Sequence, residues 1–219
     1  MRKDKQMKQK ECRAFDFTLE ARENEKHGHF IEGRAIVFGQ PYDNGFFTEY
    51  IEPGALDNTD MKDVRLLVNH NTDMIPLARS RNNNANSTMQ LSVVPEGGLD
   101  IRADLDTERN TEAQALYSAT ERGDISGMSF MFSVDGEAWE NLDADNPVRR
   151  ITSISRIYEV SAVTWPAYES TTLAARSDSE ALESAEDVLE SAKANARSDE
   201  RARRIAELKE KLATIQEEN

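Results

Sequence analysis

The sequence predicts an α+β protein with a mainly β core, at least one helix inside that core and a helical segment at the C-terminus. Three observations lead to this fold class. Short runs that alternate apolar and polar residues recur between residues 13 and 176. Residues 107–122 change to the spacing of an amphipathic helix. From Ser177 onward there is no Pro, Gly or aromatic residue.

Several segments of the core are typical of β-strands. Phe15, Phe17 and Leu19 alternate with polar residues, and residues 30–38 form a second strand-like run that contains Gly33, a candidate bulge position. Residues 64–68 are a short apolar run that ends at Asn69 and His70. We expect a buried strand there that delivers a histidine at its end.

The second half of the core is predicted in the same way. Residues 89–94 and 99–105 read as a hairpin around a Pro-Glu-Gly-Gly loop, and Asn110 or Thr111 caps the helix that Gly123 ends. Residues 128–134 form a strand, and residues 151–163 form one or two more.

The two ends of the chain differ from the core. Residues 1–12 are basic and no apolar segment follows them, so we expect a flexible arm and not a secretory signal. Residues 177–219 are a charged helical tail. Ser177 begins a capping-box pattern, and the polar stretch 195–200 predicts a break into two helices. Apolar residues repeat at a/d spacing in the second of these helices, at Ile205, Leu208, Leu212 and Ile215.

Composition limits the classes of partner and chemistry. The 219 residues carry a net charge of −14, which argues against nucleic acid as a partner. No apolar run reaches the roughly 18–20 residues that span a bilayer, which argues against a membrane-embedded chain. Cys12 is the single cysteine, so disulfides within the chain and Cys-x-x-Cys metal sites are excluded, and a reducing cytosol is the simplest compartment.

Two positions could form a nucleophile and its base. Ser129 lies in an apolar run, where a hydroxyl needs a hydrogen-bond partner, and His70 is the only credible base among three histidines. A strand serine bonded to the backbone and a core histidine at a strand end are the competing structural interpretations.

A third group would orient the imidazole. Glu159 is the best candidate, because a carboxylate in the weakly polar run 157–163 is costly unless it is paired. Asp73 and Asp124 are rivals because each lies near one of the other two residues in the sequence. An outward-facing Glu159 is the competing interpretation.

Three ordered blocks resemble the HK97-type prohead (capsid maturation) protease family of tailed phages. Residues 49–79 are similar to that family's Pro-Gly-Ala segment followed by an apolar strand and a histidine. Residues 121–134 resemble its Gly-x-x-x-Gly-x-Ser-aromatic block. Residues 149–167 resemble its Glu-Val-Ser block followed by Pro-Ala.

This resemblance implies a serine endopeptidase with a fold like that of herpesvirus assemblin, which is a mainly antiparallel, barrel-like β core with surrounding helices. It implies His70 as base, Ser129 as nucleophile and Glu159 as orienting acid, with no metal or organic cofactor. Backbone N–H groups helped by Arg149 or Arg150 would form the oxyanion hole. Residues 13–176 would be the protease domain.

The resemblance also implies a biological setting. The substrates would be the scaffold region of the major capsid protein, or a separate scaffold, and the protease itself. Cleavage would take place inside the immature capsid in the host cytoplasm. The tail would target the enzyme, self-associate or be removed by self-cleavage. A non-catalytic assembly module that keeps the protease fold is the alternative, and a metal-dependent hydrolase around His70 is disfavoured because few ligands are available.

Overall fold

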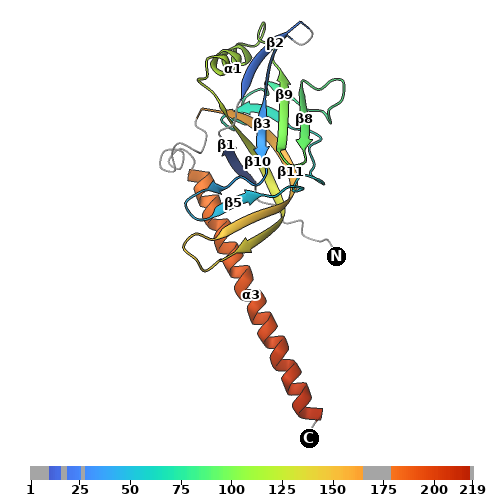
Figure 1. The fold of residues 1–219 in the computed structure, drawn as a ribbon, viewed down its shortest axis with the longest axis vertical. Coiled ribbons are helices and arrows are strands. Elements are labelled where there is room, and N and C mark those ends of the chain that lie inside the picture. Colours follow the sequence, from blue (N-terminus) through green and yellow to red (C-terminus); the bar gives the residue numbers. More distant parts are fainter. Residues whose placement is uncertain (1–9, 16–18, 26–27, 165–178, 218–219) are drawn as a thin grey trace.

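The computed structural model describes residues 10–15, 19–25, 28–164 and 179–217. The α+β class is confirmed, because most elements in these ranges are strands and two are helices, α1 and α3 (Figure 1). The predicted strand at Phe17 and the proposed cap at Ser177 lie outside the described residues.

The larger sheet has seven strands and is mixed. Its main order is β1-β10-β11-β5-β4, and β6 pairs with both β11 and β7. β11 runs parallel to β5 near its start and parallel to β6 near its end, while its pairing with β10 is antiparallel. The strands of this sheet are β1 (Glu11–Phe15), β4 (Tyr42–Asp43), β5 (Thr48–Ile51), β6 (Arg65–Val68), β7 (Ala78–Arg79), β10 (Gly127–Glu140) and β11 (Val148–Val163).

The smaller sheet has four antiparallel strands in the order β2-β3-β9-β8. The predicted hairpin is confirmed as β8 and β9. Gly98, the first residue of β9, follows the connecting turn with a φ of +131°. We expected a bulge at Gly33. The register between β3 and β9 instead shifts one to three residues later, between Arg34 and Ile36. These strands are β2 (Glu20–Asn24), β3 (Gly28–Val37), β8 (Met89–Val94) and β9 (Gly98–Asp104).

One hydrophobic core joins the two sheets. Met128, Phe130 and Phe132 of β10 pack into it together with Ile31 and Leu99 from the smaller sheet. Because side chains alternate along a strand, Ser129 and Met131 point to the opposite face of β10. The core therefore holds β10 in a register that leaves its polar face available for chemistry.

The strand pairings are mainly antiparallel, as expected, with β5 and β6 parallel to β11. Among the described residues these pairings do not close a ring, so the barrel-like core is not confirmed. In addition, β1 begins at Glu11, so the last two residues of the predicted arm belong to a strand. Ion pairs from Glu11 and Arg13 to the sheet explain this, as described below.

The helix in the core is confirmed. α1 (Thr111–Glu121) begins after Asn110, whose side-chain oxygen accepts hydrogen bonds from the backbone N–H groups of Glu112 and Ala113. Ala113 and Leu116 are buried in the core. Gly123 follows the helix with a φ of +77°, as a C-terminal stop requires.

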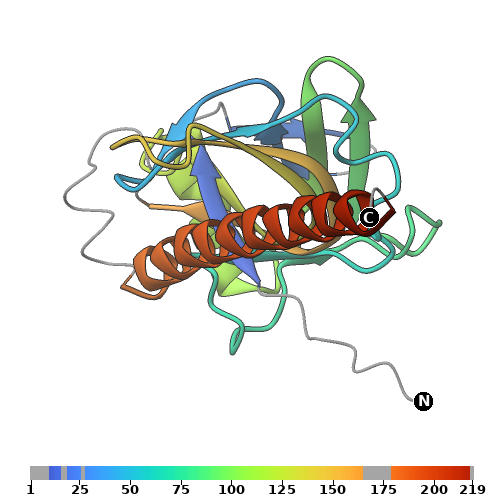
Figure 2. The ribbon, with the colours of Figure 1, turned by 90° about the horizontal axis from the view of Figure 1, so that it is seen from below.

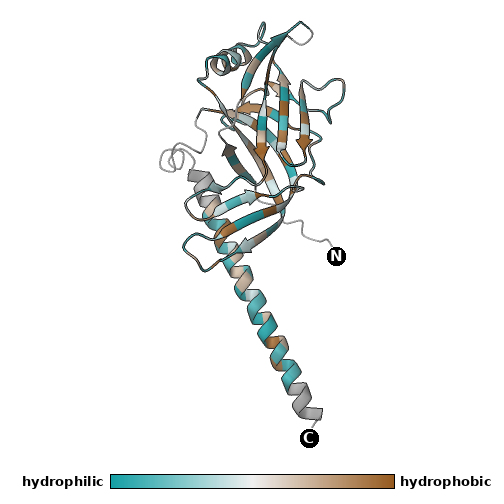
Figure 3. Cartoon of the chain, in the orientation of Figure 1, coloured by the Kyte–Doolittle hydropathy of each residue, from teal (hydrophilic) through white to brown (hydrophobic). Residues whose placement is uncertain are grey.

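The tail is one helix and not two. α3 (Ser179–Glu217) has 39 residues and continues through the polar stretch 195–200. Its first part packs on the body, where Ala185 and Leu189 cover the fully buried Phe47. The remainder extends well beyond the body (Figure 1), where Figure 2 views the helix from below, and it is mainly hydrophilic (Figure 3). Within the described ranges, no helix is both long and apolar enough to cross a bilayer.

Candidate active site

Three strands bring the predicted site residues together. In the sheet, Ser129 of β10 lies directly opposite Ser161 of β11, and Glu159 lies two residues earlier on the same face of β11. β6 pairs in parallel with this part of β11, with Leu67 beside Ser161. The chain leaving β6 therefore reaches the site at His70.

The backbone at the end of β6 adopts an unusual conformation. Asn69 and His70 have φ values of +50° and +56°, in the left-handed region that non-glycine residues seldom occupy. The N–H of Asn69 donates to the carbonyl of Ala162 at 3.0 Å, and its side-chain oxygen accepts the N–H of Thr164 at 3.0 Å. These bonds to β11 hold the turn that folds the imidazole back over the sheet.

Hydrogen bonds join the three predicted residues in a continuous chain. Nδ1 of His70 lies 2.5 Å from Oε1 of Glu159, and Nε2 lies 2.6 Å from Oγ of Ser129. A carboxylate can only accept, so Nδ1 carries a proton, and Nε2 of the neutral ring is then free to accept the serine proton. Ser129 and Glu159 are buried, whereas 20% of the His70 side chain is exposed.

The sequence model of the caudovirus prohead serine protease family matches residues 17–185, which include Ser129, His70 and Glu159. This protein chain belongs to that family. The prohead protease of Enterobacteria phage HK97 is 30% identical over 167 residues, which are 74% of this chain and 66% of that relative. The chain thus spans slightly less than two thirds of the length of this curated relative. No solved structure gives a significant match.

The candidate site includes a further contact from β1. Oγ of Ser129 lies 2.8 Å from the carbonyl oxygen of Arg13 as well as close to His70. The hydroxyl has one proton and therefore donates to one of these two acceptors at a time. Sequence reasoning missed this contact, since Arg13 lies 116 residues before the serine.

Sequence reasoning also missed Ser161. Its hydroxyl donates to Oε2 of Glu159 at 2.6 Å and accepts the backbone N–H of His70 at 3.1 Å. The signal was present in the sequence, because a Glu-x-Ser spacing on a strand places both side chains on one face. The rival carboxylates lie elsewhere: Asp124 pairs with Arg122, and Asp73 is exposed in the loop after His70.

Five charged residues form a second polar feature, which we call the buried ion cluster. Arg13 donates to Glu49 at 2.6 Å and to Glu11 at 2.7 Å. Arg149 donates to Glu49 at 2.8 Å, and to Glu11 and Glu137. The cluster joins β1, β5, β10 and β11. It consists of Glu11, Arg13, Glu49, Glu137 and Arg149.

The buried ion cluster shifts the pKa values of Arg13 and Glu11 toward their charged forms. Burial by itself lowers the pKa of Arg13, but Glu49 and Glu11 raise it by more. Burial raises the pKa of Glu11, and Arg13 and Arg149 together bring it below its ordinary value. Loss of either arginine would therefore leave a buried carboxylate without its partner.

The position of the cluster bears on the oxyanion hole. Arg149 pairs with Trp139, at the opposite end of β10 from Ser129, and Arg150 binds Glu52 and Glu140. Both guanidiniums that we considered for the oxyanion hole thus have carboxylate partners away from the nucleophile.

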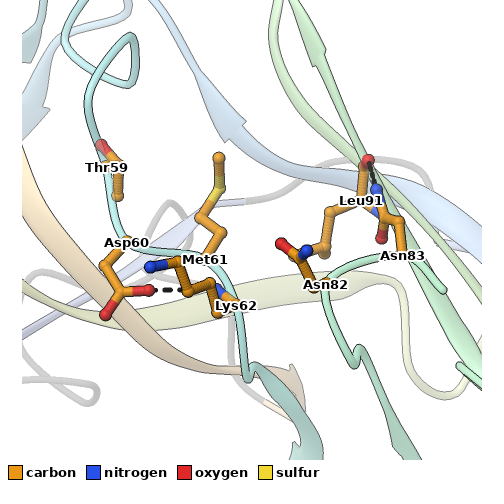
Figure 4. Close-up of a pocket in the computed structure, with 7 residues that line it drawn as sticks. All are labelled: Thr59, Asp60, Met61, Lys62, Asn82, Asn83 and Leu91. Atoms are coloured by element: carbon orange, nitrogen blue, oxygen red, sulfur yellow. Dashed lines mark hydrogen bonds between the residues drawn. The ribbon is translucent and has the colours of Figure 1, made fainter.

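A separate small pocket carries no comparable chemistry. Its polar groups bond within or beside it: the N–H of Lys62 donates to Asp60, and the amide of Asn83 donates to the carbonyl of Leu91 (Figure 4). It contains none of the three predicted site residues. Within the part of the chain that the structure describes, no group of three His, Cys, Asp or Glu side chains is placed to hold a metal ion.

Proposed function

We propose that this protein is a serine endopeptidase of tailed-phage head maturation, with Ser129 as nucleophile, His70 as base and Glu159 as orienting acid. The single observation that carries the proposal is the continuous chain of hydrogen bonds from Glu159 through His70 to Ser129. An activated serine needs a base within hydrogen-bond reach and a third group that orients that base. Membership of the prohead serine protease family supports the same reaction.

The mechanism follows from the positions of the protons. Oγ of Ser129 attacks the carbonyl carbon of the scissile peptide bond while Nε2 of His70 takes the hydroxyl proton. His70 then gives this proton to the departing amine, which leaves an acyl-enzyme. Water, deprotonated by His70, hydrolyses the ester and restores the hydroxyl. Glu159 fixes the ring tautomer and stabilises the positive charge on the imidazole in both steps.

For the substrate, we propose the scaffold region of the major capsid protein, or a separate scaffold, and the protease itself. The relative from phage HK97 is named a prohead protease, which supports a substrate within the immature capsid. Enclosure in that shell, within the host cytoplasm, would bring enzyme and substrate to a high local concentration. Self-cleavage would release segments of the chain at the end of assembly.

Mass spectrometry of the full chain co-expressed with its capsid protein tests this function. Wild type is expected to generate new termini in the capsid protein, and Ser129→Ala is expected to generate none. Ser133→Ala is the matched control, because Ser133 is a buried serine of the same strand that bonds to Tyr158 instead of a histidine. Cleavage by Ser129→Ala at the wild-type rate would reject the nucleophile assignment.

The alternative function is a non-catalytic assembly module that keeps the protease fold. A fluorophosphonate separates the two, since it reacts with an activated serine and not with an ordinary hydroxyl. We expect labelling at Ser129 that His70→Gln abolishes and Ser133→Ala leaves intact. A wild-type chain that takes no label inside assembled proheads would favour the assembly module.

We further propose that the projecting part of α3 is an assembly segment. Ile205 and Leu208 are 45% and 54% exposed, which is unusual for large apolar side chains three residues apart on a helix. In heptad terms they take the a and d positions, and the flanking g, e and g positions are basic, occupied by Arg204, Lys209 and Lys211.

The charges beside this stripe favour a partner helix over a second copy. Two copies would place like charges along the same seam, which is destabilising. An acidic helix of the scaffold region would instead pair with these basic positions. The double variant Ile205→Ser/Leu208→Ser is expected to lower incorporation into proheads, whereas the control Ala206→Ser changes the same helix at a b position, away from the stripe. Equal incorporation of both variants would reject the assembly role.

A further inference from the structure

We infer that Ser161 is a positioning residue of the proposed protease, which holds both the carboxylate and the histidine in the catalytic arrangement. This inference rests on the proposed function and extends it to a fourth side chain. Ser161 is fully buried and sits on β11 directly opposite the nucleophile. The hydrogen bonds of its hydroxyl go to Glu159 and to the backbone of His70, so it acts through these two residues.

The first contact orients the carboxylate. Oε1 of Glu159 accepts a hydrogen bond from Nδ1 of His70, and Oε2 accepts one from the Ser161 hydroxyl at 2.6 Å. A carboxylate held at both oxygens has a fixed plane, and its lone pair then points at the ring nitrogen. Without the hydroxyl, Oε2 would lose a partner in a buried place, and the carboxylate could rotate away from the ring.

The second contact holds the histidine backbone. The N–H of His70 donates to Oγ of Ser161 at 3.1 Å. His70 has a φ of +56°, a strained conformation that persists only where the surroundings enforce it. The hydroxyl satisfies the N–H that this turn directs toward β11.

The two contacts use the hydroxyl in complementary ways. Its single proton goes to Glu159 and its oxygen lone pair accepts from His70, so one side chain fixes the distance between the acid and the backbone of the base. Alanine removes both functions and little volume. Threonine keeps both and suits a strand, because its added methyl is β-branched.

The experiment compares wild type, Ser161→Ala, Ser161→Thr and the matched control Ser155→Ala. Ser155 is a serine of the same strand that donates one hydrogen bond, to the carbonyl of Ser133, away from the triad. For Ser161→Ala we expect kcat to fall about tenfold to a hundredfold at unchanged KM. The pH dependence of kcat/KM is also expected to differ from that of wild type, because a carboxylate that can rotate no longer holds one orientation toward the imidazolium.

Ser161→Thr is expected to recover most of kcat, and Ser155→Ala to keep the wild-type kcat and pH profile. Thermal unfolding of each variant shows that the chains compared are folded. If Ser161→Ala matches Ser155→Ala in kcat and pH profile, the positioning role is rejected while the protease function stands.

A readout without turnover separates the two proposals. The Nδ1 proton of His70, shared with Glu159, is expected to give a low-field proton resonance in the full chain that Ser129→Ala retains and Ser161→Ala shifts or broadens. An unchanged resonance in Ser161→Ala rejects the positioning role, even if wild type cleaves no substrate. If wild type cleaves no substrate but the resonance shifts or broadens in Ser161→Ala, only the protease function is rejected.

Discussion

Glu159 lies 2.5 Å from the imidazole of His70, although 89 residues separate them in the chain. The parallel pairing of β6 with β11 is what brings them together, since Val68, the last residue of β6, pairs with Ala162. The contact depends on the carboxylate being an acceptor only, and this gives a direct test of its role.

Glu159→Gln is expected to keep the fold and lower kcat strongly, by about 10⁴-fold where the amide selects the wrong ring tautomer. An amide has nearly the same shape as a carboxylate, but it carries no charge to stabilise the imidazolium. The measurement is kcat/KM on a capsid-derived peptide. Asp124→Asn serves as the control, because Asp124 was a rival in the sequence and pairs with Arg122 on the surface. A comparable loss in both variants would contradict the assignment of Glu159.

Two neighbouring arginines of β11 provide a test of the buried ion cluster. Arg149→Met removes a fully buried cation and leaves Glu11 and Glu49 without one of their partners, so we expect a loss of about 3–5 kcal/mol in the free energy of unfolding. Arg150→Met removes an arginine that also binds two carboxylates but is partly exposed, and we expect a clearly smaller loss. Urea unfolding measures both, and similar losses would show that the cluster contributes little.

The buried ion cluster also predicts how stability depends on pH. The pKa of Glu11 in the folded chain is below its ordinary value of 4.5, so folding favours the ionised form. Its contribution is present above about pH 4.5 and is lost as the pH falls through the lower, folded value. Urea midpoints measured between pH 3 and pH 7 should fall on the acid side. In Glu11→Gln the midpoint should be lower at neutral pH and should change less with acid.

The turn between β8 and β9 predicts a strong effect at a glycine. A Cβ on Gly98 would lie 1.8 Å from the carbonyl oxygen of Ile36, and its φ is +131°. Gly98→Ala is therefore expected to cost at least about 2 kcal/mol. Gly123→Ala also has a positive φ but meets open space, and about 1 kcal/mol is expected. Thermal unfolding of the pair checks the difference, and equal losses would contradict it.

The sequence was most informative where a polar residue interrupts an apolar strand. His70, Ser129 and Glu159 each stand out in this way, and the structure brings all three together. The buried ion cluster was not predictable by the same reasoning. Its partners are up to 138 residues apart, and nothing local distinguishes Arg149 from the partly exposed Arg150.

The ends of elements were less predictable than their presence. The break expected at residues 195–200 does not occur, since that stretch contains polar residues but no Gly or Pro, and a helix already anchored at Leu189 continues through it. β10 continues past residue 134 to Glu140, because its polar second half is paired with the first half of β11 instead of being packed in the core.

The first strand has a consequence for how a peptide reaches the nucleophile. Over residues 128–132, β10 is flanked by β1 on one side and by β11 on the other, so no backbone edge is open at Ser129. An incoming chain cannot extend the sheet there while β1 keeps its register. It must approach the sheet from the side where the imidazole is partly open to solvent.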